Sequence, residues 1–179
     1  METKTIKIKK QKKPSYYNKV MITKKIHVPI VKVGKDLKAT LEKYISSEVE
    51  GRCIEMGYVQ PKSVRVFSYT SGELKDSLAI FDVVYECMIC HPVEGMEIDC
   101  VALNITETAG IRAETQEKPS PLIIYLARDH NYQIPEFSKV KVGDKIRVKV
   151  IGQRFELNDS AVSVIAELVE NRPKISRRR

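Results

Sequence analysis

Apolar residues recur at helical spacing in an early segment of the chain. Leu37, Leu41, Tyr44 and Ile45 follow one another at intervals of three and four residues, which is the spacing of one face of an α-helix. Gly51 lies a few residues further on, where a left-handed cap is common. The pattern predicts a helix that starts near Lys35 and ends before Gly51.

Most of the remaining chain has the pattern of β-strands. Met21 to Ile30 predicts a first strand, and Pro29 places it at a sheet edge. Leu78 to Cys90 is rich in β-branched and aromatic residues, and its length indicates a strand shared between two sheets or bent at a bulge. Gly57–Val59 leads through Pro61 into a predicted strand at Val64–Phe67. Further strands are predicted at Glu97–Ile105, Ile111–Thr115, Leu122–Ala127, Lys145–Ile151 and Ala161–Leu168.

The last five of these strands match the strand count of an OB barrel. The longest gap between them, Arg128 to Val142, is where that fold places a small helix or a long loop. Pro92 follows the long strand and removes a ladder donor, so we place a domain boundary near His91–Val93. The expected fold class is α+β, mostly β, with domains at residues 20–92 and 93–170.

Charge divides the chain into neutral and basic parts. The net charge is +8, yet residues 1–13 and residues 172–179 each carry +5, so the body between them carries −2. Such dense like charge predicts a disordered basic arm at residues 1–19 and a disordered tail at 171–179. These ends are either solubilising, or they bind nucleic acid or act as a nuclear import signal.

Composition also indicates the compartment. No apolar run reaches the ~18 residues of a membrane span, and the charged N-terminus lacks the apolar core of a secretory signal. The four cysteines are therefore expected in a reducing environment, without disulfides. We expect an intracellular protein with no membrane association.

One predicted strand presents a row of cations. Lys145, Arg147 and Lys149 alternate with apolar residues, so period two places the three charges on one solvent face. This is either an ordinary solvated face or a phosphate-tracking groove for single-stranded RNA. The RNA-binding hypothesis comprises Lys139, Lys141, Lys145, Arg147, Lys149 and Arg154.

The sequence predicts no metal, cofactor or catalytic site. Cys87 and Cys90 have the spacing of a zinc knuckle, but they lie within a predicted strand, where residues three apart point to opposite faces. Buried structural cysteines are the better interpretation. His27, His91 and His130 are scattered, with no carboxylate at motif spacing.

Three segments, in order, resemble the stalk subunits of multisubunit RNA polymerases, a family that comprises the seventh subunit of polymerase II and its archaeal counterpart. The resemblance covers about residues 20–170. The first segment is Glu48 to Cys53 followed by Gly57-Tyr58-Val59. The others are Phe81–Tyr85 continuing through Ile89–Glu97, and Gly143–Val150 followed by Gly152.

The resemblance implies a truncated ribonucleoprotein-like tip domain joined to an OB barrel of the S-one type. By the same resemblance, the tip docks on the polymerase core, and the barrel faces nascent RNA. A helical partner, equivalent to the fourth subunit of polymerase II or its archaeal counterpart, would pack along the stalk. The polymerase-docking residues would be Gly51, Arg52, Gly57, Tyr58 and Val59, in an inserted loop.

The chain also departs from the family pattern. His91-Pro92 replaces a Phe-Pro pair, Gly110 lacks the following aromatics that stack on RNA, and the Lys-rich arm is an addition. The arm indicates a divergent, virus-encoded copy, located in a cytoplasmic factory or virion; otherwise the expected location is the nucleus. The alternative is a free-standing OB-fold RNA-binding factor such as a translation initiation factor, which leaves the Glu48 to Val59 segment unexplained.

Overall fold

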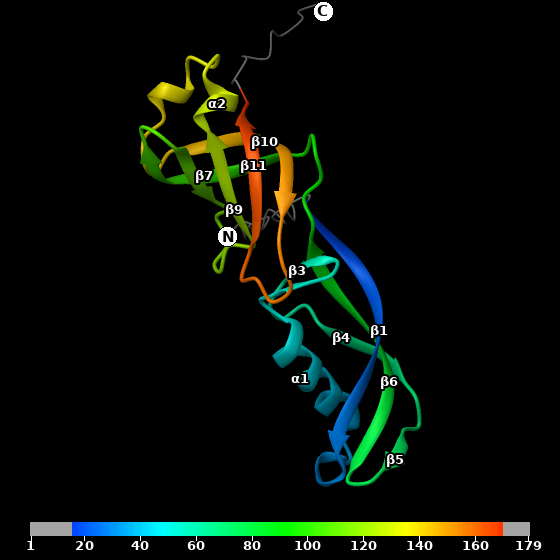
Figure 1. Ribbon diagram of the computed structural model, residues 1–179. Helices are drawn as coiled ribbons and strands as arrows, with labels where there is room; N and C mark the ends of the chain where they lie inside the picture. The colour runs from blue at the N-terminus through cyan, green and yellow to red at the C-terminus, as the bar shows by residue number, and fades with distance from the viewer. Residues whose placement is uncertain (1–15, 170–179) are drawn as a thin grey trace, which may run out of the picture.

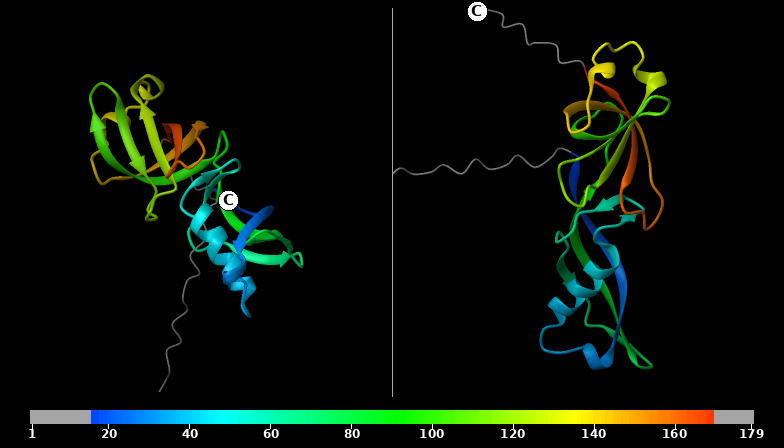
Figure 2. Two further views of the ribbon diagram at one scale, coloured as in Figure 1. Left: turned by 60° about the horizontal axis from the view of Figure 1, so that its bottom comes forward. Right: turned by 90° about the vertical axis from the view of Figure 1, so that its left-hand side faces the viewer.

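The computed structural model describes residues 16–169. The predicted tail, and the predicted arm up to residue 15, lie outside the described residues. Within them, no helix is long and apolar enough to cross a membrane. The molecule is elongated, with a barrel at one end and a sheet covered by one helix at the other (Figure 1 and the right-hand view of Figure 2).

The first sheet is built around one long strand, β6 (Leu78–Cys90). β1 (Tyr17–Pro29) pairs with all thirteen residues of β6 along one side, and shorter strands pair with its other side. β1 therefore lies at the sheet edge, as Pro29 indicated. The shorter strands are β2 (Cys53–Ile54), β3 (Gly57–Val59), β4 (Arg65–Tyr69) and β5 (Glu73–Lys75).

β1 begins at Tyr17, four residues before the predicted start. Residues 17–19, which were expected in the disordered arm, continue the ladder to the end of β6, where Tyr17 pairs with Cys90. Tyr16 and Tyr17 are buried against the barrel core. Burial of two aromatic side chains therefore overrides the high local lysine content at this point.

The helix α1 (Leu37–Val49) covers one face of this sheet and is preceded by a short helix, η1 (Ile30–Lys32). Its buried stripe is Leu41, Ile45 and Val49, at intervals of four residues. The Asp36 side chain accepts a hydrogen bond from the Ala39 amide at 3.3 Å and caps the start. Gly51 follows the helix with a φ of +73°, so the predicted left-handed cap is confirmed.

The second sheet closes into a five-stranded, OB-like barrel. The strands follow one another in the order β10-β11-β9-β8-β7, and β9 and β11 are parallel while the other neighbours are antiparallel. The predicted strand count is confirmed. The strands are β7 (Glu97–Thr106), β8 (Gly110–Glu114), β9 (Leu122–Ala127), β10 (Lys145–Arg154) and β11 (Val162–Leu168).

The segment between β9 and β10 contains two short helices, α2 (Arg128–Asn131) and η2 (Phe137–Lys139). Phe137 is buried in the barrel core, whereas Tyr132 is exposed. The fully buried Asn131 donates to the Ala127 carbonyl at 2.7 Å and accepts from the Leu168 amide at 2.7 Å. These bonds fasten α2 to the end of β11.

Three sets of contacts join the two sheets. The β2 backbone exchanges two hydrogen bonds of 2.8 Å with residues 158 and 159, in the loop between β10 and β11. The Tyr17 hydroxyl donates to Glu117 at 2.9 Å, and the His91 and Gln153 Nε2 atoms lie 2.9 Å apart. β6 itself passes from one core to the other, because Cys87 packs in the sheet–helix core and Cys90 in the barrel core.

Candidate functional site

The predicted cationic row lies on the outer face of the barrel. Lys145, Arg147 and Lys149 are exposed on β10, while Val148 and Val150 between and beside them are buried in the barrel core. The predicted alternation is therefore confirmed. A register shift between Val150 and Gly152 bends the strand, and Arg154 is exposed beyond it.

Carboxylates on the neighbouring strands compensate most of this charge. Arg147 Nε and Nη2 lie 2.7 and 3.2 Å from the two carboxylate oxygens of Asp99, the residue directly opposite on β7. Glu97 is also within 3.9 Å of Arg147, and Lys149 is 3.4 Å from Glu167 on β11. The hydrogen bond and the charge of Asp99 raise the pKa of Arg147. Two of the three cations in the row are thus paired with carboxylates.

The other proposed RNA-binding cations lie on different elements. Lys139 is in η2, and the Lys141 backbone amide donates to Asp144 at 2.8 Å. Arg154 pairs with Glu156 at 3.1 Å. Lys139, Lys141 and Lys145 have no carboxylate partner among residues 16–169. The free positive charge is therefore at the start of β10 rather than along its whole length.

A second exposed row crosses the barrel on β8, β9 and β11. Tyr125 lies directly opposite Arg112 on one side and Ile165 on the other. The exposed fractions are 43% for Tyr125 and 46% for Ile165. The accessible ring offers a stacking face to a nucleic-acid base, and the Arg112 guanidinium beside it is paired with Glu114 at 3.2 Å. The alternation of Tyr125 with Ile124 and Leu126 indicates that its ring lies outside, but its position beside Arg112 and Ile165 depends on strand register and was not predicted.

The segment expected as an inserted loop is a hairpin of β2 and β3, and three of its five proposed docking residues are buried. Gly57, Tyr58 and Val59 form β3, paired with β2 and with the end of β6, and Tyr58 and Val59 have no exposed surface. A Cβ atom on Gly57 would lie 2.5 Å from the Cys90 carbonyl oxygen, at a φ of +127°. Only glycine fits there. The hairpin exposes Arg52, Glu55 and Met56 instead.

All four cysteines are buried and free of disulfides. Cys87 and Cys90 point into different cores, so the predicted strand placement of this pair is confirmed. Burial raises the pKa of Cys53 and Cys87 to about 11 and that of Cys100 to about 12. Across residues 16–169, no three histidine, cysteine, aspartate or glutamate side chains gather in a way that could hold a metal ion.

No protein-family model matches the sequence. The chain is similar to a protein of Acanthamoeba polyphaga mimivirus named "Putative DNA-directed RNA polymerase subunit L376". The two are 25% identical over 142 residues, which cover 70% of this chain and 68% of the viral protein.

Proposed function

We propose that this chain is a non-catalytic stalk subunit of a DNA-directed RNA polymerase. The observation that carries the proposal is the similarity to the mimivirus protein, whose name is that of an RNA polymerase subunit. A sheet–helix domain joined to an OB-like barrel agrees with the architecture that the resemblance implied. Its partners would be the polymerase core subunits and a helical stalk subunit, in the nucleus or, for a virus-encoded copy, in a virion or cytoplasmic factory.

In this proposal the ribonucleoprotein-like tip domain, residues 20–92, docks on the polymerase core. Because Gly57, Tyr58 and Val59 are buried, they would shape the hairpin rather than contact the core. The residues available for contact in the hairpin are Arg52, Glu55 and Met56, and Met56 is 47% exposed. The barrel, residues 93–170, contacts nascent RNA through Tyr125 and Arg112 and through the free lysines at the start of β10.

Co-purification tests the proposal. The tagged full-length chain is expressed in the cells in which its polymerase is made, then isolated and analysed by mass spectrometry. The expected result is recovery of the large catalytic polymerase subunits in amounts equal to the tagged chain. An Arg52→Glu, Met56→Ser variant should lose these subunits but remain folded, whereas the matched surface variant Lys118→Glu, Val93→Ser should retain them.

An OB-fold RNA-binding factor outside any polymerase is the second candidate, favoured by the closed barrel. It predicts that the tagged chain is recovered with ribosomal subunits or alone. Recovery without any polymerase subunit would overturn the stalk assignment.

A further inference from the structure

A surface at the end of the molecule away from the barrel combines free cations with exposed aliphatic side chains. It consists of η1, which precedes α1, and the outward stripe of α1 itself (Figure 1). Four residues of α1 share one helix face, because they are spaced three or four residues apart around the helix: Thr40, Lys43, Tyr44 and Ser47. Tyr44 packs partly against the sheet–helix core, whereas Lys43 and Ser47 are exposed. With Lys32 of η1, this face lines a hollow of about 500 Å³.

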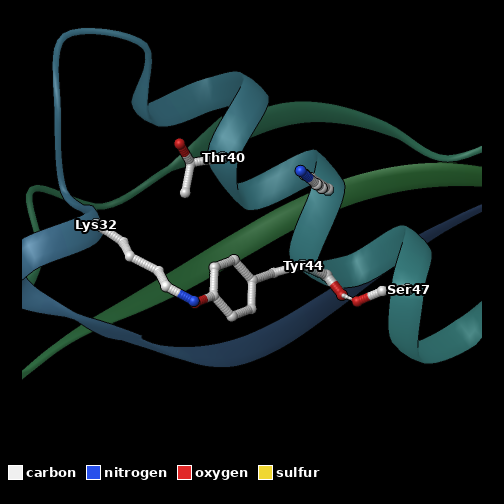
Figure 3. A pocket seen from close by; sticks show the side chains of 5 residues that line it. Lys32, Thr40, Tyr44 and Ser47 are labelled. Atoms are coloured by element: carbon white, nitrogen blue, oxygen red, sulfur yellow. Dashed lines mark hydrogen bonds between the residues drawn. The ribbon is translucent and has the colours of Figure 1, made fainter.

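The hollow presents donors to an anion. The Lys32 ammonium lies 5.3 Å from the centroid of the Tyr44 ring, and the close view shows its side chain reaching toward that ring from η1 (Figure 3). The Thr40 hydroxyl already donates to the Asp36 carbonyl at 3.0 Å, and the Ser47 hydroxyl to the Tyr44 carbonyl at 2.8 Å. The donors left for a ligand are the ammonium groups of Lys32 and Lys43 and the Tyr44 hydroxyl.

The carboxylates of this region are engaged elsewhere. Asp36 caps α1, Glu42 accepts from the Val66 amide at 2.9 Å, and Glu48 binds Lys24 at 2.6 Å. The lysines of η1, α1 and the residues between them have no carboxylate partner among residues 16–169. They are Lys32, Lys35, Lys38 and Lys43.

Aliphatic side chains adjoin these cations. Val31 is 93% exposed, and its neighbours Ile30 and Val33 are also exposed. Neighbouring exposed apolar residues are typical of surfaces that bind another protein. A nucleic acid would need an open aromatic face for base stacking, but Lys32 lies over the ring of Tyr44, the aromatic residue of the hollow.

We propose that this η1–α1 surface binds an acidic amphipathic segment of another protein, with a carboxylate between Lys32 and Lys43 and an apolar side chain against Val31. Unpaired cations beside aliphatic groups match a segment that alternates acidic and apolar residues. The inference rests on the proposed function, because it names the chemistry of the partner on which the tip docks. It places the docking contact on η1 and α1 in addition to the β2–β3 hairpin.

The test is a nuclear magnetic resonance titration of the full chain. The probe is a synthetic peptide of alternating glutamate and leucine, and the comparison peptide carries glutamine in place of glutamate. Amide shifts should change in residues 30–47 with the acidic peptide only. Lys32→Glu with Lys43→Glu should weaken binding about tenfold, and Val31→Ser should weaken it with all lysines intact. The matched control Lys75→Glu with Lys118→Glu makes the same charge change elsewhere and should bind normally.

Two outcomes overturn the inference. One is the absence of shift changes in residues 30–47 with the acidic peptide, and the other is a larger change there with oligouridylate, which would make the surface a nucleic-acid site. The proposed function fails separately, by the loss of polymerase subunits in co-purification of the unmodified chain. If the polymerase subunits are recovered and the peptide does not bind, the stalk role stands and the η1–α1 surface is not its docking site.

Discussion

Arg147 and Asp99 face each other across β10 and β7 and form two hydrogen bonds, of 2.7 and 3.2 Å. The guanidinium therefore lies against a carboxylate where a phosphate would otherwise bind. A phosphate that approaches Arg147 competes with Asp99, and it gains little charge neutralisation because the cation is already paired. The cationic row is mostly a charge-matched ladder, which stabilises strand pairing.

We expect RNA binding to become more salt-dependent when the ladder's carboxylates are neutralised. Each phosphate contact with a single strand contributes about −0.7 to the log–log salt slope. A triple variant frees Arg147 and Lys149 from their carboxylates: Glu97→Gln, Asp99→Asn and Glu167→Gln. Two additional phosphate contacts should then steepen the salt slope by about 1.4. Fluorescence anisotropy of labelled oligouridylate at several salt concentrations measures this.

The matched control removes three carboxylates from the tip, with Glu55→Gln, Glu73→Gln and Asp76→Asn. It makes the same change in net charge, so a pure long-range effect would steepen both slopes equally. Equal slopes in the two variants would show that the β10 face does not contact RNA.

Tyr125 should contribute stacking affinity that salt does not affect. Tyr125→Ala is expected to weaken oligouridylate binding by about 1–3 kcal/mol without changing the salt slope, because it removes a ring and no charge. Tyr132→Ala is the control, since Tyr132 is another exposed tyrosine of the barrel half. The same anisotropy measurements apply, and equal losses in the two variants would argue against a platform at Tyr125.

The long strand shows what local pattern predicts well. Leu78 to Cys90 has the predicted bounds, because its apolar and β-branched residues continue to the point where Pro92 removes a donor. β2 and β5 were missed. They have two and three residues, and their hydrogen bonds depend on the position of a partner strand, which no local period encodes.

The surroundings of the candidate residues could not be predicted, for the same physical reason. The period-two rule correctly placed Arg147 on the solvent face, but its partner Asp99 is 48 residues away in the sequence. Register between distant strands decides whether a cation is free, and a single strand contains no information about its neighbour. Tyr58 likewise lies between a glycine and a proline, which is typical of a loop, and its burial depends on pairing with β2 and β6 and on packing in the barrel core.

The buried β3 strand makes a prediction about stability. Tyr58→Ala should lower the free energy of unfolding by about 3–5 kcal/mol, since it removes a fully buried ring. Tyr58→Phe should be neutral or stabilising, because the Tyr58 hydroxyl is buried without a hydrogen-bond partner. Urea denaturation followed by circular dichroism measures both. A marked loss of stability in Tyr58→Phe would reveal a hydrogen bond to this hydroxyl.

The thiols should be unreactive in the folded protein. Burial raises the pKa of Cys53 to about 11 and that of Cys100 to about 12, and thiolate is the reactive form. At neutral pH, a chromogenic disulfide reagent should label few thiols before denaturation and all four after it.

Elemental analysis should show far less than one zinc per chain. Stoichiometric zinc that is lost in Cys87→Ser would contradict the structural role.

Tyr17 should make the domain joint sensitive to alkaline pH. Burial and the hydrogen bond to Glu117 raise the pKa of Tyr17 above its usual value near 10. As pH rises above about 10, the unfolded chain releases this proton while the folded chain retains it. The contribution of Tyr17 to the free energy of unfolding is therefore complete below pH ~10, and it falls by about 1.4 kcal/mol per pH unit above that pH.

Tyr17→Phe removes this titration, so its free energy of unfolding should fall less steeply above pH ~10 than that of the unmodified chain. The cysteines titrate in both proteins, and the difference between the two curves isolates Tyr17. Tyr132→Phe is the control, because it removes the hydroxyl of an exposed tyrosine of the barrel half. Urea titrations at several alkaline pH values give the curves. If Tyr17→Phe kept the full slope, the Tyr17 hydroxyl would be titrating freely in the folded chain, and the contact with Glu117 would not hold the barrel loop against β1.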